Sequence, residues 1–221
     1  SDFAAMGANT FSLQRYDSQV RINGGSRDQI NPIISYREAK EFKDRFEYPF
    51  TTTSISFTGT TTAEVKHLNA KTDPEVRVLG VNENFLNNSG LELEDGRDFN
   101  YFDIENNNNV AIVGSDFGKG LLKDIDPIGQ EISIRGAKFR VIGILEEQGS
   151  TFGNSEDLRV LIPIQYARSI FSTPNINYQI SVKVADKRLL ESAQDEAIIT
   201  FRNIRGLNPI EENNFGMTRS E

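Results

Sequence analysis

The chain has 221 residues, and its 32 acidic against 24 basic residues give a net charge of -8 at neutral pH. Binding to nucleic acid requires a basic surface, so nucleic acid is not expected as a partner. The chain contains no cysteine, which excludes disulfides, thiolate metal sites and thiol nucleophiles.

No apolar run approaches the roughly 18 residues that a membrane-spanning helix needs. The first residues, SDFAAMGANTF, lack both the basic start and the long apolar stretch of a signal peptide. We therefore expect a soluble chain, and its start is compatible with a cut end from which membrane-embedded parts were removed.

The first elements are predicted from short-range patterns. Apolar residues that alternate with polar ones predict a strand at residues 9–16, and a loop rich in Asn and Gly follows at residues 23–31. Ser35 and Glu38 then form a capping-box pattern, in which each side chain accepts a hydrogen bond from the other residue's backbone N–H. A helix is expected to begin there and to end near Phe46.

Residues 50–70 are rich in Thr, Phe, Ile and Val, which favour strands. Gly59 is interpreted as the break between two of them. His67 lies in the second strand and is the only histidine of the chain. Because no second imidazole exists to complete a zinc site or a base-assisted nucleophile, we expect an exposed strand histidine without a catalytic role.

The middle of the chain is predicted to consist of many short elements. A helical turn is expected at residues 83–88 and a run of turns at residues 90–103. Pro163 is expected to begin a short helix that ends near Phe171. Apolar runs predict five strands, which are residues 76–81, 110–113, 131–135, 139–145 and 159–162.

The stretch AIVGSDFGKGLL at residues 111–122 looks like a phosphate-binding loop between a strand and a helix. It departs from the P-loop pattern, because the gap from Gly114 to Gly118 is one residue short and Lys119 is followed by a glycine. The dinucleotide fingerprint G-x-G-x-x-G is not met either. We interpret the stretch as a buried strand, a tight exit at Gly114 and a helix with Ser115 as its N-cap.

The last third of the chain has clearer periodicity. Alternating apolar and polar residues predict a strand at residues 178–185. Asp186 is expected to cap a helix, and Gly206 lies where the C-terminal stop of that helix is expected. Residues 208–221 carry few signals.

Two further patterns were considered as sites of chemistry. Oxygen-bearing side chains at alternate positions suggest a calcium loop, and they are Asp103, Glu105, Asn107 and Asn109. Asn108 stands where an EF-hand needs glycine, so a solvated turn is expected instead. Paired catalytic carboxylates beside aromatic platforms are not recognisable, since the chain has no Trp. No catalytic, cofactor-binding or metal-binding residue is therefore assigned, and neither a cofactor nor an enzymatic activity is expected.

An ordered series of motifs runs through the middle of the chain. The motifs are VLGVNENFL at residues 78–86, LEDGRDF at 93–99, VAIVGSDFGKGLL at 110–122, DPIGQEISIRGAKFRVIGIL at 126–145 and LRVLIPI at 158–164. In this order and spacing they resemble the extracytoplasmic core domain of the MacB-type ABC transporter permeases, a family that includes macrolide exporters and relatives of lipoprotein-releasing permeases. MGANTF at residues 6–11 is similar to the family's segment just after its first membrane span.

The resemblance implies an α+β fold in two lobes, a porter-like lobe with a βαβ unit that is interrupted by a smaller α/β lobe called Sabre. Residues 1–62 and 173–221 are expected to form the discontinuous porter-like lobe, and residues 70–168 the Sabre-like insert. The chain is expected to cross between the lobes near residues 59–62 and 172–175.

The resemblance also implies a function outside the cytoplasm, on the periplasmic side of the bacterial inner membrane. The expected function is non-catalytic: the domain binds a partner or substrate and couples cytoplasmic ATP hydrolysis to export or lipoprotein release by mechanotransmission. The expected partners are a second copy of the permease, a periplasmic adaptor protein or the exported substrate, and the membrane through spans outside this chain.

The alternative from another class is an extracytoplasmic small-molecule sensor or solute-binding domain. That alternative needs a pocket with a few convergent polar groups. A hydrolase with paired carboxylates is disfavoured, because the sequence has no recognisable catalytic constellation.

Overall fold

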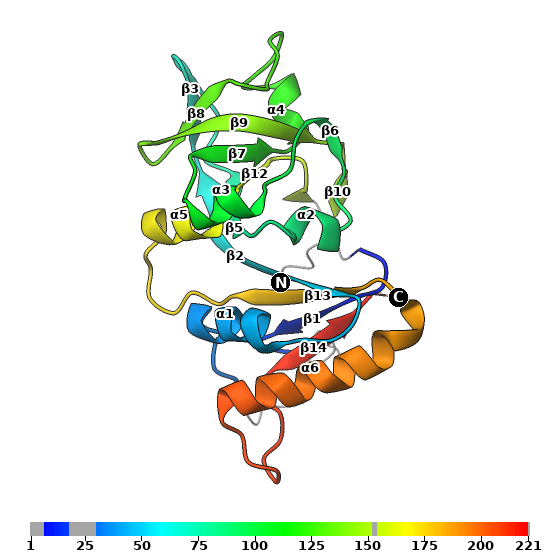
Figure 1. The fold of residues 1–221 in the computed structure, drawn as a ribbon. Helices are drawn as coiled ribbons and strands as arrows, with labels where there is room; N and C mark the ends of the chain where they lie inside the picture. Colours follow the sequence, from blue (N-terminus) through cyan, green and yellow to red (C-terminus); the bar gives the residue numbers. More distant parts are fainter. Residues whose placement is uncertain (1–6, 18–29, 152–153, 221) are drawn as a thin grey trace. The chain divides into compact units, whose positions relative to one another are not determined.

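The structure is a computed structural model that describes residues 7–17, 30–151 and 154–220. Contacts divide the chain into two compact units, whose elements Figure 1 labels. Unit 1 comprises Ser1–Ile55, Asn87–Gly90 and Thr173–Glu221, and unit 2 comprises Ser56–Leu86 and Leu91–Ser172. The predicted loop at residues 23–31 lies almost entirely outside the described residues.

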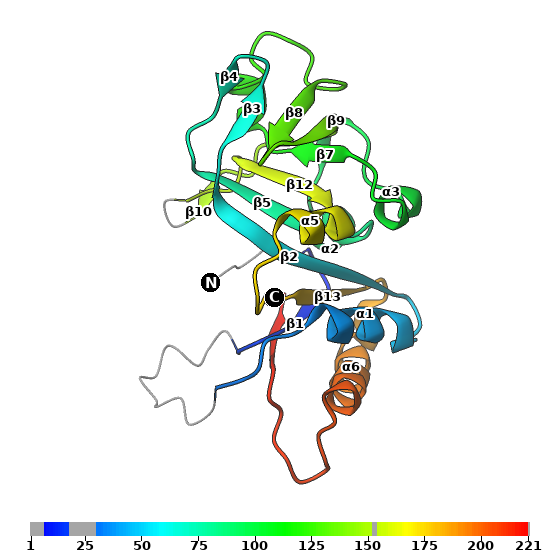
Figure 2. The same ribbon diagram turned by 90° about the vertical axis from the view of Figure 1, so that its left-hand side faces the viewer.

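The described residues of unit 1 form four strands and two longer helices. Its elements are β1 (Thr10–Gln14), α1 (Tyr36–Arg45), the start of β2 (Thr51–Ala63), β13 (Gln179–Val184), a 3₁₀ turn (Lys187–Leu189), α6 (Leu190–Arg205) and β14 (Gly216–Arg219). The strand order is β14-β1-β13-β2, and β1 is antiparallel to both β13 and β14. Both helices lie on one face of this sheet, as Figures 1 and 2 show.

Aromatic side chains join the two helices of unit 1. The rings of Phe42 in α1 and Phe201 in α6 meet edge to face with centroids 6.2 Å apart, and Phe201 meets Phe215 at 4.8 Å. Glu38 of α1 pairs with Arg205 of α6 at 3.1 Å. Because the three rings are buried, they form the core of unit 1 beneath its helices.

The predicted signals at the ends of these helices are confirmed, with one correction. Ser35 Oγ accepts from the Glu38 N–H at 3.1 Å, and Glu38 Oε1 accepts from the Ser35 N–H at 3.0 Å. Gly206 ends α6 in the left-handed conformation, with a φ of 69°. Asp186 caps the 3₁₀ turn rather than α6 itself, because its side chain accepts from the Arg188 N–H.

Two parts of unit 1 were not predicted. β14 pairs with β1 in the stretch that carried few signals, and Phe11 lies opposite Arg219. The short segment Asn87–Gly90 belongs to unit 1. The buried Asn88 side chain donates to the carbonyls of Thr52 and Ser181, at 2.8 and 3.1 Å. In both cases the hydrogen-bond partners are distant in sequence, so local sequence patterns do not predict these contacts.

Unit 2 contains many short elements, as predicted. After the rest of β2 they are β3 (Val65–His67), β4 (Ala70–Lys71), β5 (Val76–Val81), α2 (Phe85–Asn88, which ends in unit 1), β6 (Leu93–Gly96), α3 (Tyr101–Glu105), β7 (Val110–Val113), α4 (Asp116–Lys119), β8 (Glu131–Ile134), β9 (Ala137–Leu145), β10 (Ser150–Thr151), β11 (Asn154–Ser155), β12 (Arg159–Pro163) and α5 (Ile164–Ile170). β10 and β11 form a separate small pair.

The main sheet of unit 2 is open and mixed. Its strand order is β2-β5-β12-β7-β9-β8-β3-β4, with β6 paired to β9. β5 is parallel to β12 and β7 is parallel to β9, whereas the other pairs are antiparallel. β7 and β12 are buried throughout, which explains why they read as continuous apolar runs. Strands of both directions with a few helices confirm the predicted α+β class. Within the described residues, no helix is long and apolar enough to cross a membrane.

The predicted break at Gly59 is wrong, because β2 continues through it to Ala63. Gly59 lies at a shift in register between β2 and β5, where Thr58 and Thr60 pair with consecutive residues of β5. A side chain at this position would overlap the ring of Phe171, which is fully buried. The glycine therefore permits close packing rather than a turn.

β6 and α3 lie in a stretch that was expected to be turns. After a shift in register Asp95 of β6 lies opposite Ile144 of β9, so Glu94 is an extra residue and forms a β-bulge. Gly96 then has a φ of 87°, and a side chain there would overlap the Ile142 carbonyl oxygen. The bulge and the glycine together set where the acidic side chains of β6 lie.

Candidate functional site

The stretch that looks like a phosphate-binding loop folds as a strand, a tight exit and one helical turn. A side chain at Gly114 would overlap the Asp157 carbonyl oxygen, so the interpretation of a tight exit is confirmed. Ser115, however, does not cap α4 with its side chain, because its backbone is already helical, with φ of -62° and ψ of -26°. A capping side chain needs an extended backbone to reach the N–H groups two and three residues on. Ser115 is therefore the N-cap residue of α4 by position, as predicted, but it does not make the side-chain hydrogen bond of a cap.

Backbone N–H groups of this turn are bonded within the protein. Gly114 donates to the Arg159 carbonyl at 2.9 Å, and Asp116 donates to the Asp157 carbonyl at 3.1 Å. A phosphate loop leaves such N–H groups pointing at the anion. These donors are therefore not available to a phosphate without breaking a bond to β12 or to the residues just before it.

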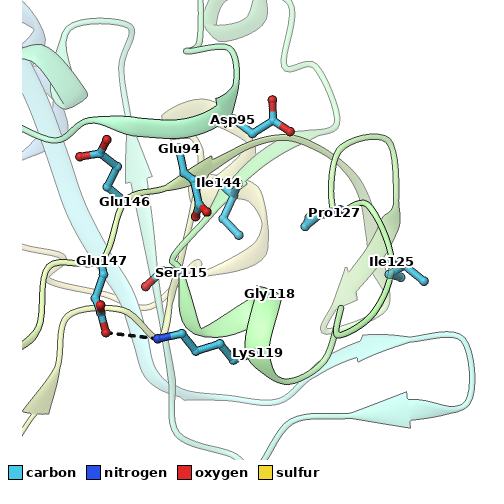
Figure 3. A pocket seen from close by; sticks show the side chains of 10 residues that line it. All are labelled: Glu94, Asp95, Ser115, Gly118, Lys119, Ile125, Pro127, Ile144, Glu146 and Glu147. Atoms are coloured by element: carbon cyan, nitrogen blue, oxygen red, sulfur yellow. Dashed lines mark hydrogen bonds and ion pairs between the residues drawn. The ribbon is translucent and has the colours of Figure 1, made fainter.

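A hollow of about 570 Å³ lies beside the turn (Figure 3). Its volume is in the range of small-molecule sites, roughly 300–1,000 Å³. All the residues around it belong to unit 2 and come from β6, from the end of β9 and the two residues after it, and from α4 with its flanking loops. They are Glu94, Asp95, Ser115, Gly118, Lys119, Ile125, Pro127, Ile144, Glu146 and Glu147.

The residues around the hollow carry a negative net charge, because they include four carboxylates and one ammonium group. Lys119 Nζ lies 3.2 Å from Glu147 Oε1, and both side chains are exposed. This hydrogen bond raises the pKa of Lys119, so the lysine stays protonated and Glu147 neutralises it. Within the part of the chain that the structure describes, the carboxylates of Glu94 and Glu146 have no hydrogen bond or ion pair. An anion such as phosphate is therefore disfavoured in the hollow.

The side chains around the hollow differ in direction. In Figure 3, Glu94 reaches from β6 toward Ile144, whereas the Asp95 carboxylate points away from α4. Asp95 Oδ1 also accepts from the next backbone N–H, at 2.8 Å. Ile144 is 4% exposed and contributes almost no surface to the hollow, whereas Ile125 is 43% exposed. In Figure 3 Ile125 lies on the side of the hollow opposite Glu94 and Glu146.

Ser115 adds a buried polar group to the wall. It is 7% exposed, and its Oγ has no hydrogen-bond partner among the described residues. Figure 3 shows this oxygen directed toward the side of the hollow on which Glu147 lies. A buried hydroxyl without a partner is uncommon in native structures, because it loses its bonds to water without replacing them.

The carboxylates do not converge on one point. Among the described residues, no group of three or more His, Asp or Glu side chains is placed to hold a metal ion. A divalent cation needs several oxygen ligands within about 2.0–2.6 Å of one position. The described residues therefore offer no site for a divalent metal ion in the hollow.

The predicted environment of His67 is wrong. Its side chain is 8% exposed rather than solvated, and Nε2 lies 3.1 Å from Gln130 Oε1. β3 is an inner strand of the sheet, with β4 and β8 as its neighbours. The contact with a neutral amide gives the histidine a structural role.

Asp103 also differs from the expected solvated turn, because it is only 2% exposed. Its carboxylate accepts from Arg97 Nη1 at 2.8 Å, from the Asn100 N–H at 3.0 Å and from Asn108 Nδ2 at 2.9 Å. Burial by itself would raise the pKa of Asp103, but these hydrogen bonds outweigh it and hold the pKa below its ordinary value. The carboxylate fixes the start of α3, where Asn100 and Asp103 form a second capping box.

Asp98 is a titratable group that the sequence did not single out. Burial raises the pKa of its carboxyl to about 6, and the negative charge of Glu83 adds to the effect. A hydrogen bond from the Phe99 N–H, at 2.6 Å, acts in the opposite direction. Only the position of this side chain in the folded unit could reveal the shift.

The chain is similar in sequence to a known protein family and to one of its members. The model of the MacB-like periplasmic core domain matches residues 1–198. The macrolide export ATP-binding/permease protein MacB of Neisseria gonorrhoeae is 27% identical over 185 residues, which are 84% of this chain and 27% of that protein. This chain therefore spans little more than a quarter of that relative.

Two solved structures share the fold. The periplasmic region of MacB from Actinobacillus actinomycetemcomitans matches with a TM-score of 0.72 at 18% identity, over 97% of this chain and 90% of that one. The extracellular domain of the noncanonic ABC-type transporter YknZ from Gram-positive bacteria matches with a TM-score of 0.65 at 17% identity. The match covers 95% of this chain and 100% of that one.

Proposed function

Because the chain belongs to the family of MacB-like periplasmic core domains, as its ordered motifs predicted, we propose that it is the non-catalytic external domain of an ABC transporter permease. In the full protein it lies on the periplasmic side of the bacterial inner membrane. It passes movement between the membrane spans and a partner, while a separate cytoplasmic module hydrolyses ATP. The family match over residues 1–198 is the observation that carries this proposal.

The proposed partners are a second copy of the permease and either a periplasmic adaptor protein or the exported substrate. Export is proposed because the Neisseria relative is named a macrolide export protein. That name describes the relative, and the substrate of this protein is a separate question.

The two compact units support a mechanical role. Each has its own packed core, so each can move as a body while a few connecting residues absorb the rotation. The chain passes between the units after Ile55, on either side of Asn87–Gly90, and after Ser172. We propose that unit 1 corresponds to the porter-like lobe, with expected bounds of 1–62 and 173–221, and unit 2 to the Sabre-like lobe, expected at 70–168.

A crosslink between the units tests the coupling role. The chain has no cysteine, so pairs with one cysteine in each unit can be introduced without background thiols. Pairs that oxidise in the intact transporter are expected to abolish transport, and reduction is expected to restore it. A pair inside unit 2, Ser133→Cys with Lys138→Cys on facing positions of β8 and β9, is the matched control and should leave transport unchanged. Full transport with a complete crosslink between the units would contradict the proposal.

The alternative function, a small-molecule sensor or solute-binding domain, is favoured by one observation, the hollow beside α4. Thermal-shift screening separates the two functions. A small molecule that strongly raises the melting temperature of the isolated chain would favour the sensor.

A further inference from the structure

We propose that unit 1 contacts the surface of the lipid bilayer through Phe50, whose ring enters the layer of lipid headgroups. The contact rests on the proposed function, because that function joins this chain to membrane spans outside it. Three observations support it: the exposed ring, the backbone conformation that presents the ring, and the edge of the sheet at which Phe50 lies.

The side chain of Phe50 is exposed and is not needed to pack unit 1. It is 68% exposed, and among the described residues its ring has no aromatic or cation–π contact. The backbone of Phe50 is used instead, because its carbonyl accepts from the Ala185 N–H at 2.8 Å. Any residue type supplies a carbonyl, so the fold does not explain why an aromatic ring stands here.

The backbone at Phe50 has a conformation that disfavours a bulky residue. Pro49 and Phe50 form the turn before β2, and the φ of Phe50 is 62°. Proline followed by a positive φ is the pattern of a type II turn, in which glycine or asparagine is expected at the second of these two positions. Phenylalanine in this conformation lowers stability. The strained backbone and the exposed ring together indicate a contact outside the described chain.

Phe50 lies at the edge of unit 1 where β1 begins and β14 ends. Just before β1, the Asn9 carbonyl accepts from the Val184 N–H at 3.0 Å, and the residue bonded to Phe50 directly follows Val184. Just after β14, the Ser220 N–H donates to the Thr10 carbonyl at 2.9 Å. Figure 1 shows β13 running toward this edge and β1 running away from it. β1 and β14 are the first and last strands described, so membrane spans outside the chain connect to it through this edge.

The charged groups at this edge suit a layer of lipid headgroups. Lys187 and Arg188 lie in the 3₁₀ turn that follows β13, and Arg219 ends β14. All three side chains are exposed, and Arg188 pairs with Asp186 at 2.9 Å. Lys187 and Arg219 have no hydrogen bond or ion pair among the residues the structure describes, so lipid phosphates can bind them. An aromatic ring together with unpaired cations is the composition of an interfacial contact.

Release from vesicles tests the contact on the isolated chain. A C-terminal His tag holds the chain on vesicles of phosphatidylcholine and phosphatidylglycerol that contain nickel-chelating lipid, and imidazole releases it. Phe50→Asn removes the ring but keeps a residue that tolerates positive φ. The variant should leave the vesicles about three- to tenfold faster, because a partly buried ring adds a second contact to the tether. On nickel-chelating beads without lipid, the two chains should be released equally. Equal release from the vesicles would overturn the proposal.

Ile210→Asn is the matched control. Ile210 is 93% exposed and belongs to the same unit, but it lies in the loop that precedes β14, whereas the proposed contact is where β14 ends. This variant removes an equally exposed apolar side chain and should change the release rate less than about twofold, since membrane binding depends on the apolar area that enters the bilayer. If it speeds release as much as Phe50→Asn, the contact is not specific to Phe50 and the assignment is refuted.

Tryptophan fluorescence locates the ring relative to the lipid. The chain has no tryptophan, so Phe50→Trp and Ile210→Trp each provide a single reporter. On tethered vesicles, bromine atoms in the lipid acyl chains should quench the emission of Phe50→Trp, and the emission should move to shorter wavelength. Ile210→Trp should show neither effect. Absence of quenching in Phe50→Trp, or equal quenching in both variants, would contradict the proposed contact.

The free chain and the intact transporter separate this contact from two other roles of Phe50. Phe50→Asn should leave the melting temperature of the free chain unchanged or raise it, because asparagine accepts a positive φ more readily. A lower melting temperature would show that the ring serves the fold. Loss of transport with unchanged release from vesicles would assign Phe50 to a protein partner, and either result would overturn the proposal. The vesicle measurements do not depend on transport, so failure of the coupling role and failure of the lipid contact are distinguishable.

Discussion

Replacement of Asp98 by Asn should stabilise the protein at alkaline pH and have no effect at acid pH. Asn keeps the oxygen that accepts from the Phe99 N–H but removes the charge that burial disfavours. Because the pKa of Asp98 is raised in the folded state, folding takes up a proton there. The native chain is therefore most favoured below the unfolded-state pKa and loses this stability as the pH rises through about 6.

The size of the effect follows from the interval between the two pKa values. From the ordinary value of 3.8 to about 6, at 1.36 kcal/mol per pKa unit, a fully buried group would contribute about 3 kcal/mol. The Asp98 side chain is only half-buried, so solvent screening reduces the expected gain of Asp98→Asn at pH 8 to about 1–2 kcal/mol.

Urea unfolding of the native chain and the variant between about pH 4 and pH 8 measures this gain. Asp95→Asn is the control, since Asp95 also accepts a backbone N–H but is exposed. Its substitution should change the free energy of unfolding by less than about 0.5 kcal/mol across the range. The reasoning would be refuted if Asp98→Asn gave the same gain at both ends of the range, or destabilised the chain at pH 8.

Three further predictions concern the core and the motifs. Asp103→Asn should destabilise unit 2 by about 2–3 kcal/mol, because a buried acceptor of four hydrogen bonds loses its charge beside Arg97. Since the folded pKa of Asp103 is lowered, this difference in urea unfolding should be full above about pH 4 and shrink as the pH falls through the folded value. Gly59→Ala should lower the free energy of unfolding by about 1–3 kcal/mol, because the added methyl group overlaps the ring of Phe171. Phe171→Leu in the same chain should recover part of that stability. A Gly59→Ala chain as stable as the original would rule out the packing role. Calorimetry with ATP or a divalent metal should show no stoichiometric micromolar site at residues 114–120 or at Asp103, and such a site would contradict the interpretation of both motifs.

The sequence predicted well those elements whose causes lie within a few residues. The capping box of Ser35 and Glu38, the alternation that became β13 and the glycine stop of α6 all depend on neighbours along the chain. Their free energy is local, so the pattern is enough to predict them. The family was predicted in a different way, from the order of motifs over the middle of the chain.

The tertiary structure decided the features that depend on distant partners. A glycine among strand-forming residues suggests a break in the strand, but β2 runs through Gly59 without one. Glycine is needed there because the ring of Phe171, which is distant in sequence, packs against its backbone. β14 forms because the free edge of β1 is there to pair with it, although its own residues carry little strand signal.

The candidate site belongs to the same class of feature. Glu94, Ser115 and Glu146 come from three separate segments, and none of them stood out as a motif. What joins them is the register of β6 on β9 and the exit of the chain after β7. The sequence by itself determined the local elements, the absence of thiol chemistry and the family. The hollow, its unpaired charges and the raised pKa of Asp98 arise only when the strands pair, because burial and register are properties of residues brought together by folding.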